Sequence, residues 1–316
     1  MMPIDLSHPA YHDDNAAREL LEGIRWPNGV TCPHCGSIDQ ARALAGKSMG
    51  PGWFYCGACK DKFTVRTGTV YERSHIPLHK WTLGFRLFAS SKKGFSAHQL
   101  HRTLGITYKS AWFMAHRIRE AMTDGDPAPL GGKDKVVEID EAYTGPTKVI
   151  YKNKGGWMKK QGANARRDNV LSLVERGGRA RSFRIHEVTL PVVAKVLAQH
   201  VHPESTVHTD TAGIYKSLGK KFAKHESVNH TEKEYARGNV TTNTVEGFFS
   251  IFKRGMTGIY QHCGEQHLRR YLAEFDFRYS YRVACGYDDA ARTLLAIKGA
   301  EGKRLTYIQS RIRDAA

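Results

Sequence analysis

Two closely spaced cysteine pairs near its start constrain the fold of this chain more than any other feature. Cys32 and Cys35 form one C-x2-C pair, and Cys56 and Cys59 form a second after the twenty intervening residues 36–55. Each pair can occupy a tight turn with both sulfurs on one side, and two such turns close a tetrahedral zinc site with four sulfur ligands. The pattern therefore predicts a bound zinc ion.

We expect this zinc to be structural. No thioredoxin-like βαβ pattern surrounds the pairs, and four thiolates leave no open position on the metal for catalysis. The runs WFYC and KFTVRTGTV around the second pair are typical of strands, so the sequence predicts a zinc ribbon. Cys263 and Cys285 stand alone and are interpreted as plain thiols.

The charge balance indicates a polyanionic partner. The 316 residues include 48 Lys and Arg against 31 Asp and Glu, which gives a net charge of +17. Such an excess attracts nucleic acid through counterion release. The sequence shows no run of about 18 apolar residues and no secretory pattern at its N-terminus. We therefore expect a cytoplasmic protein with no membrane partner, associated with the nucleoid through double-stranded DNA.

The pattern of residues 77–122 predicts three helices. The first is closed by Gly94, the second has Ser96 at its N-cap and the third has Thr107, with the Gly-containing turn LGIT between the last two. This order is typical of a helix-turn-helix, whose last helix enters the major groove of DNA. A plain three-helix bundle with a basic surface is the alternative. In the DNA-binding interpretation, the polar residues exposed on the third helix are Tyr108, Lys109, His116, Arg117 and Arg119.

The second half of the chain follows a different pattern, after a Gly- and Pro-rich linker at residues 125–133. Three strand-like runs (KVVEIDEAYTG, NVLSLVERGG and ARSFRIHEVT) precede a helix, LPVVAKVLAQHV. A strand, a helix, a strand and a helix follow: STVHTD, AGIYKSLGKKF, KHESVNH and NTVEGFFSIFKRG. Three antiparallel strands followed by such units are the order of an RNase H-like domain.

The sequence therefore predicts a multidomain protein of the α+β or α/β class, with a mixed catalytic sheet flanked by helices. The expected domains are an N-terminal helix with the zinc ribbon (1–74), the helix-turn-helix segment (75–126), the RNase H-like domain (133–285) and a C-terminal helical tail (286–316).

Acidic residues mark the ends of the predicted elements. Asp140 ends the first strand, Asp210 ends the fourth and Glu246 lies on the following helix. Neighbouring first and fourth strands would bring these carboxylates to one edge, where oxygen ligands can hold two Mg²⁺ or Mn²⁺ ions. Asn243, one turn before Glu246, can supply an amide oxygen, and Lys253, two turns after it, can hold a phosphate. Taken singly, each residue is better explained as a strand end, a helix cap or a solvated side chain, but together with the strand order and the basic charge they favour a metal site. Glu141 could replace Asp140, although alternation points it to the opposite face.

Four stretches together resemble a bacterial insertion-sequence transposase of the DDE superfamily, in the subgroup with an N-terminal zinc ribbon. They span roughly residues 25–282 and read CPHCG…YCGACKDKFTVRTGT, VVEIDEAYTG, VHTDTAGIY and NTVEGFFSIFKRGMTGIYQHCGEQHLRRYLAEFDFRY. The resemblance implies an RNase H-like domain that cuts and joins DNA, binding to terminal inverted repeats, and assembly as a homo-oligomer on DNA.

The resemblance also assigns roles to residues. Asp140 matches the first acid, Asp210 the second and Lys253 the trailing lysine. The third ligand is Asn243 or Glu246, and ligand chemistry favours Glu246, because a carboxylate binds Mg²⁺ more strongly than an amide.

The expected function is that of a DNA transposase with metal-dependent strand cleavage and strand transfer. The basic stretch of residues 148–167 is expected to grip the DNA backbone. The alternatives are a zinc-ribbon DNA-binding regulator with an inactive RNase H-like domain, and a related RNase H-like nuclease. The repeat sequence, the target, the choice between cut-and-paste and copying, and whether the element is active are left open.

Overall fold

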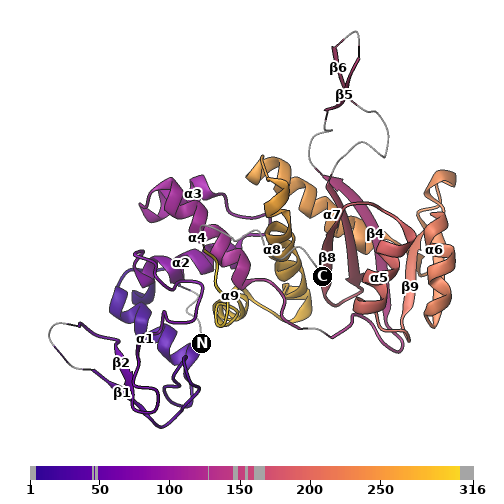
Figure 1. Ribbon diagram of the computed structural model, residues 1–316. Coiled ribbons are helices and arrows are strands. Elements are labelled where there is room, and N and C mark those ends of the chain that lie inside the picture. The colour runs from indigo at the N-terminus through magenta and orange to yellow at the C-terminus, as the bar shows by residue number, and fades with distance from the viewer. Residues whose placement is uncertain are drawn as a thin grey trace. The chain divides into compact units, whose positions relative to one another are not determined.

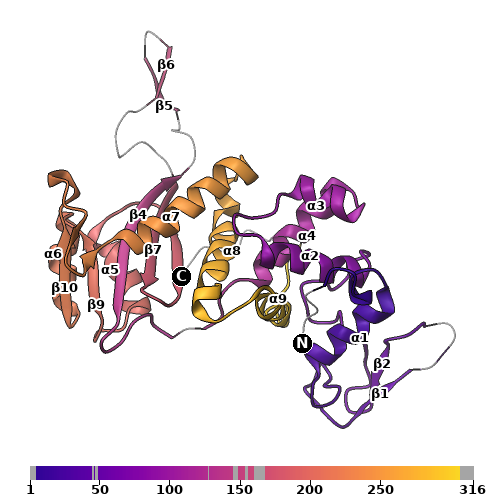
Figure 2. The same ribbon diagram turned by 180° about the vertical axis from the view of Figure 1, so that it is seen from behind.

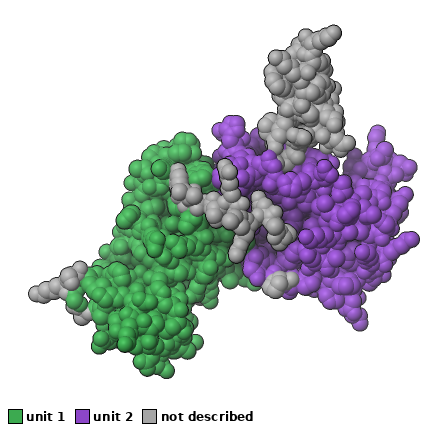
Figure 3. Space-filling model, viewed as in Figure 1, with its two compact units in different colours: residues 1–123, 286–316 green, residues 124–285 purple. Residues whose placement is uncertain are grey.

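A computed structural model describes residues 5–44, 46, 49–126, 128–144, 149–153, 156–159 and 168–306 (Figure 1). The chain divides into two compact units (Figure 3). Unit 1 comprises residues 1–123 and 286–316, and unit 2 comprises residues 124–285. Within the described ranges, no helix is both long enough and apolar enough to span a bilayer.

The first half of unit 1 is the predicted zinc ribbon. It begins with the short helix η1 (Pro9–Tyr11) and helix α1 (Asp14–Arg25). Three short antiparallel strands follow in the order β1 (Ala41–Ala43), β2 (Phe54–Cys56) and β3 (Lys62–Phe63). The rings of Phe54 and Phe63 stack with centroids 5.6 Å apart, and Trp26 packs edge-on against both. This small aromatic core supports the strands that present the second cysteine pair.

The helix-turn-helix of unit 1 begins and ends where the sequence predicts, whereas the helix before it ends at Ser90, short of the predicted Gly94. The three helices are α2 (Leu78–Ser90), α3 (Ala97–Leu104) and α4 (Tyr108–Ala121), and the unit also contains α9 (Asp289–Lys298). Ser96 and Thr107 accept hydrogen bonds from the backbone amides of Gln99 and Ser110, as N-caps do. Gly105 ends α3 in the left-handed conformation. A tight helix-turn-helix results.

Close packing joins these helices. Gly84 of α2 has no side chain, and a Cβ there would lie 2.5 Å from Cε of Met114 on α4. Helix α9 contacts α2, so the predicted C-terminal helical tail packs inside the same unit as the ribbon. The division of the chain into four domains stays a prediction.

Unit 2 contains a five-stranded mixed sheet. Its strands are β4 (Val136–Thr144), β7 (Asp168–Glu175), β8 (Ala180–Ile185), β9 (Thr206–Asp210) and β10 (Lys224–Val228). The spatial order is β10-β9-β4-β7-β8, with β4, β7 and β8 antiparallel and β9 and β10 parallel to β4. The first and fourth strands of the sheet are therefore neighbours, as the RNase H-like interpretation requires.

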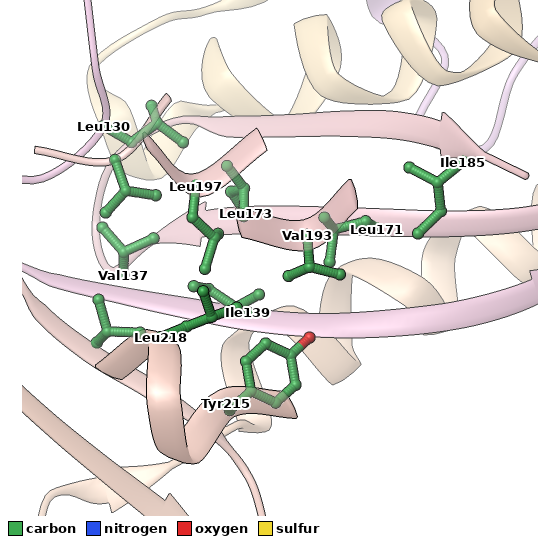
Figure 4. Close-up of a cluster of buried hydrophobic side chains, with 12 residues drawn as sticks. Leu130, Val137, Ile139, Leu171, Leu173, Ile185, Val193, Leu197, Tyr215 and Leu218 are labelled. Atoms are coloured by element: carbon green, nitrogen blue, oxygen red, sulfur yellow. The ribbon is translucent and has the colours of Figure 1, made fainter. Parts of the chain in front are cut away.

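Helices cover both faces of this sheet. Helices α5 (Leu190–His200) and α6 (Gly213–Leu218) lie on one face, and α7 (Asn243–Gly255) and α8 (Leu268–Ser280) lie on the other (Figures 1 and 2). Figure 4 shows Ile139 and Leu171 of the sheet packed among Val193, Leu197 and Tyr215 of the first pair. The second pair buries phenylalanines of α7 against the opposite face.

Unit 2 also contains several smaller elements. Two pairs of strands are the hairpin β5 (Val149–Asn153) and β6 (Gly156–Lys159) and the antiparallel pair β11 (Ala236–Arg237) and β12 (Val240–Thr241). The short helical turns are the 3-10 turns η2 (Gly219–Lys221), η3 (His230–Glu232), η5 (Glu265–His267) and η6 (Val283–Cys285), and the π-helical turn η4 (Met256–Tyr260). The hairpin β5–β6 falls in the basic stretch predicted to grip DNA, and the rest of that stretch lies outside the described residues.

The segment predicted as a linker is held firmly to unit 2. Asp124 and Asp126 form ion pairs with Arg181 and Arg179 at β8. Leu130 is completely buried and exchanges backbone hydrogen bonds with residues at the end of α5. Apolar burial and ion pairing therefore fix this part of the chain, despite its Gly and Pro content.

Candidate active site

The four cysteines of the ribbon meet in one cluster. Their sulfurs all lie within 4.8 Å of one another, with 3.7 Å between Cys32 and Cys59 and 3.6 Å between Cys35 and Cys56. A tetrahedral zinc with Zn–S bonds of about 2.3 Å has sulfurs about 3.8 Å apart. The geometry therefore fits a structural zinc ion coordinated by four sulfurs.

Two of the predicted acids lie on adjacent parallel strands. Strands β4 and β9 pair from Val136 and Thr206 to Glu138 and His208. Asp140 and Asp210 lie two residues further along these strands, at the same edge of the sheet. The neighbours of Asp140 show which face it uses, because Glu138 contacts α7 and Glu141 contacts Tyr215 of α6. Asp140 therefore faces α7, and Glu141 points to the opposite face, as alternation predicts.

Electrostatics tie the third acid to this pair. The pKa of Asp140 is raised to about 6, chiefly by burial and then by the negative charges of Asp210 and Glu246, while a hydrogen bond from the amide of Glu141 and the nearby His230 oppose the rise. Glu246 lies in the first turn of α7. Asp210 and Glu246 therefore act on Asp140 as like charges, which favours protonation of Asp140 in the absence of a cation.

The spacing of the acids differs from that of the cysteines. Within the described part of the chain, the cysteines are the one group of three or more potential metal ligands that meet within 4.8 Å, so at least two of the carboxylates of Asp140, Asp210 and Glu246 lie further apart than that. Ligands of a single Mg²⁺ at about 2.1 Å lie within about 4.2 Å of each other. Ligands on opposite sides of two ions about 4 Å apart can be separated by about 8 Å. In this arrangement the three carboxylates therefore do not all reach a single ion.

Neighbouring side chains hold Glu246 in place. Its Oε1 accepts a hydrogen bond of 2.8 Å from the hydroxyl of Thr242, and Nε2 of His230 lies 3.3 Å away. His230 also lies 3.0 Å from the Thr242 hydroxyl. The contact of His230 with Glu246 was not predicted, because a lone histidine outside a spaced motif gives no local signal. Asn243 is the first residue of α7 and is exposed.

Lys253 lies two turns after Glu246 on the same helix. Its side chain is exposed, and its ammonium lies 5.9 Å from the ring centroid of Phe249. The position leaves the ammonium accessible to a phosphate in solution.

Sequence reasoning missed two residues beneath the acids. Glu138 is completely buried and accepts hydrogen bonds from the amides of Thr244 and Val245, at the start of α7. The guanidinium of Arg176 pairs with it at 2.6 Å. In the sequence, Glu138 is an ordinary polar residue within an alternating strand, so its long-range role gave no local signal.

The predicted DNA-binding set divides in two. Tyr108 is 44% exposed and stacks on His98, and Lys109 is exposed beside it at the start of α4. The expectation that His116, Arg117 and Arg119 are exposed is wrong, since they retain only 1%, 9% and 2% of their surface. Arg117 donates to the carbonyl of Glu72, and the guanidinium of Arg119 lies over the ring of Phe88. The second half of α4 therefore faces the interior of unit 1.

Comparisons with known proteins agree with the fold and the cysteine cluster. Residues 129–280 match the ISXO2-like transposase domain, and residues 12–62 match the transposase zinc-ribbon domain. An uncharacterized protein in the transposable element ISH50 of Halobacterium salinarum is 28% identical over 287 residues, which cover 88% of this chain and 93% of that protein.

Structural similarity adds nothing further. The Mos1 transposase paired-end complex with the left transposon end is 9% identical, over 70% of this chain and 80% of that one, but its TM-score of 0.18 is too low to support an argument. The two domain matches cover both the ribbon and the sheet with its helices. The chain belongs to the insertion-sequence transposases that carry an N-terminal zinc ribbon.

Proposed function

We propose that this transposase binds the inverted repeats at the ends of its element and cuts and joins DNA strands there with divalent cations. The observation that carries the proposal is the cluster of Asp140, Asp210 and Glu246. Burial and the two neighbouring charges hold the pKa of Asp140 well above its ordinary value. Such an arrangement opposes folding unless cations neutralise it, so it is expected where a protein binds metal.

The three carboxylates are the proposed ligands of Mg²⁺ or Mn²⁺. A bound pair of such ions activates the attacking oxygen and stabilises the leaving oxygen of a phosphodiester. Asp140 and Asp210 present their carboxylates from neighbouring strand ends, and Glu246 presents its own from the start of α7. Glu246 is preferred to Asn243 as the third ligand, because His230 and Thr242 orient its carboxylate.

DNA is expected to contact both units. Lys253 would hold a phosphate near the carboxylates as a point charge. At the start of α4, the exposed pair Tyr108 and Lys109 would reach the DNA, because recognition helices contact bases through their N-terminal residues. Assembly as a homo-oligomer on DNA and association with the nucleoid stay predictions.

The test replaces one acid and compares binding with cleavage. Asp210→Asn should abolish strand cleavage of a duplex that carries the DNA flanking the gene, while binding of that duplex stays nearly unchanged. Glu204→Gln is the matched control, because this exposed carboxylate lies just before the opposite end of β9. A cleaving Asp210→Asn variant would remove this residue from the mechanism. Wild-type binding without any cleavage in Mg²⁺ or Mn²⁺ would favour the regulator.

A further inference from the structure

Helix α7 begins without a side-chain cap of its own. Thr242 occupies its N-cap position, but the hydroxyl of this residue donates to Glu246 and accepts no bond from the helix. The amides of Thr244 and Val245, which an N-cap side chain ordinarily satisfies, donate instead to Oε2 of Glu138 at 2.7 and 3.0 Å. A strand residue more than 100 positions earlier in the chain therefore caps the helix that carries the third acid.

The cap is charged and fully buried. The other oxygen of Glu138, Oε1, accepts from the Thr244 hydroxyl at 2.8 Å and from Nε of Arg176 at 2.6 Å. Both oxygens are thus engaged, each with two donors. An anion at a helix N-terminus is also favoured by the partial positive charge of the helix dipole.

Arg176 extends this contact to the chain that leads into the helix. Its Nη1 donates to the carbonyl of Asn239, and its Nη2 donates to the carbonyl of Thr241. The same Nη2 lies 3.2 Å from Nδ1 of His208 on β9. Arg176 therefore ties the approach to α7 to the two central strands at once.

This cluster lies directly beneath the acids. Glu138 and His208 pair across β4 and β9, and each precedes its acid, Asp140 or Asp210, by two residues on the same strand. A shift of α7 by one residue would rotate its side chains by about 100° and turn Glu246 away from both strands. Directional bonds to two successive amides oppose such a shift, whereas apolar contacts alone would tolerate it.

We propose that Glu138, clamped by Arg176, is a positioning residue that fixes helix α7 so that Glu246 faces Asp140 and Asp210. The inference rests on the proposed function, because it assigns Glu138 no contact with DNA or metal. It acts only through the placement of Glu246.

Glu138→Gln tests the proposal with little change of shape. One carboxylate oxygen becomes an NH₂ group, so either the two helix amides or the Arg176 and Thr244 donors face another donor. Glu175→Gln is the matched control. Glu175 is a buried carboxylate on the adjacent strand. One of its oxygens accepts a hydrogen bond from the amide of Gly131 and the other accepts one from the ammonium of Lys135, so these bonds do not involve α7.

Three measurements separate positioning from general stability. In Glu138→Gln, hydrogen exchange of the Thr244 and Val245 amides should become faster, and the rise in melting temperature on adding Mn²⁺ should shrink. Cleavage of the flanking-DNA duplex should fall by about 100-fold, the loss expected for a misplacement of about 1 Å, and excess Mn²⁺ should recover part of it. Glu175→Gln should lose stability and keep wild-type values in all three.

A second variant protects the test against failure to fold. Arg176→Lys keeps the positive charge beside Glu138 but loses the forked donors to Asn239 and Thr241, and it should show the same pattern in milder form. The proposal is overturned if Glu138→Gln matches Glu175→Gln in amide exchange and in Mn²⁺ response. A wild-type protein that neither responds to Mn²⁺ nor cleaves would instead overturn the proposed function.

Discussion

Neutralising Asp140 should stabilise the metal-free protein. The pKa of this carboxyl rises from its ordinary 3.8 to about 6, chiefly because of burial and then because of the charges on Asp210 and Glu246. A rise of this size corresponds to about 3 kcal/mol by which the ionised carboxylate opposes folding at neutral pH. Asn has nearly the same shape, carries no charge, and can still accept the hydrogen bond from the amide of Glu141.

Asp140→Asn should therefore melt higher than the wild-type protein in EDTA at pH 7.5. For a domain of the size of unit 2, 1 kcal/mol corresponds to about 2–4 °C, so the full effect is about 6–12 °C. The difference should be complete above pH 6 and should disappear as the pH falls towards 4, because the wild-type carboxyl then becomes protonated in the folded state. Calorimetric melting across this pH range measures both effects.

Added Mn²⁺ should reverse the order of stability. The wild-type protein gains stability when a cation binds the folded state, whereas the variant lacks one ligand and gains less. Asp126→Asn is the control, because hydrogen bonds from the amide of Ala128 and from Arg179 lower the pKa of that carboxyl, so the same change should lower the melting temperature. A metal-free Asp140→Asn protein that melts below wild type, or a difference that persists unchanged to pH 4, would refute the electrostatic argument.

Three further predictions follow from the site and from unit 1. Cys56→Ser should reduce the zinc content measured by atomic absorption from about one ion per chain to none and should unfold the ribbon, whereas Cys285→Ser should change neither. Glu246→Gln should abolish cleavage in a duplex assay while Asn243→Ala retains most of it, and the opposite result would make Asn243 the third ligand. Lys109→Ala should weaken binding of the flanking duplex and reduce the slope of log affinity against log salt by about 1, whereas Arg119→Ala should instead cost about 2 kcal/mol of stability in urea unfolding.

The sequence predicts the sheet and its acids because local patterns encode them. The residues of each strand alternate between apolar and polar or are uniformly apolar, and parallel neighbouring strands end at the same edge of the sheet. The proximity of Asp140 and Asp210 could therefore be predicted from the sequence. The cysteine spacing encodes the ribbon in the same way. In both cases, the signal lies in short motifs and in their order along the chain.

The sequence could not show which distant groups form hydrogen bonds with the buried polar side chains. Arg117 and Arg119 follow a helical pattern that predicts exposure, yet their stems pack inside unit 1 and their charged ends reach a carbonyl and an aromatic ring. Glu138 finds its partners on a helix that begins more than 100 residues later. Such contacts depend on which elements the fold brings together, and no local pattern records them.

Different interactions hold the two ends of α7 against the sheet. Further along the helix, Phe248 and Phe252 are buried among apolar side chains of β4, β7 and α8. At the start, near the acids, the hydrogen bonds of Glu138 and Arg176 are added to the apolar packing of the buried Val245. Further apolar packing at that end would remove more water from the carboxylates and raise the pKa of Asp140 further, which would oppose cation binding.

A buried ion pair is often no more stabilising than apolar side chains of the same volume, so stability alone does not explain the presence of Glu138 and Arg176. Their hydrogen bonds have direction, however, and fix the rotation of the helix as well as its distance from the sheet. A carboxylate that must meet two others around bound cations needs that rotation fixed before the cations arrive. The polar contacts therefore supply orientation to Glu246 where apolar packing would supply only proximity.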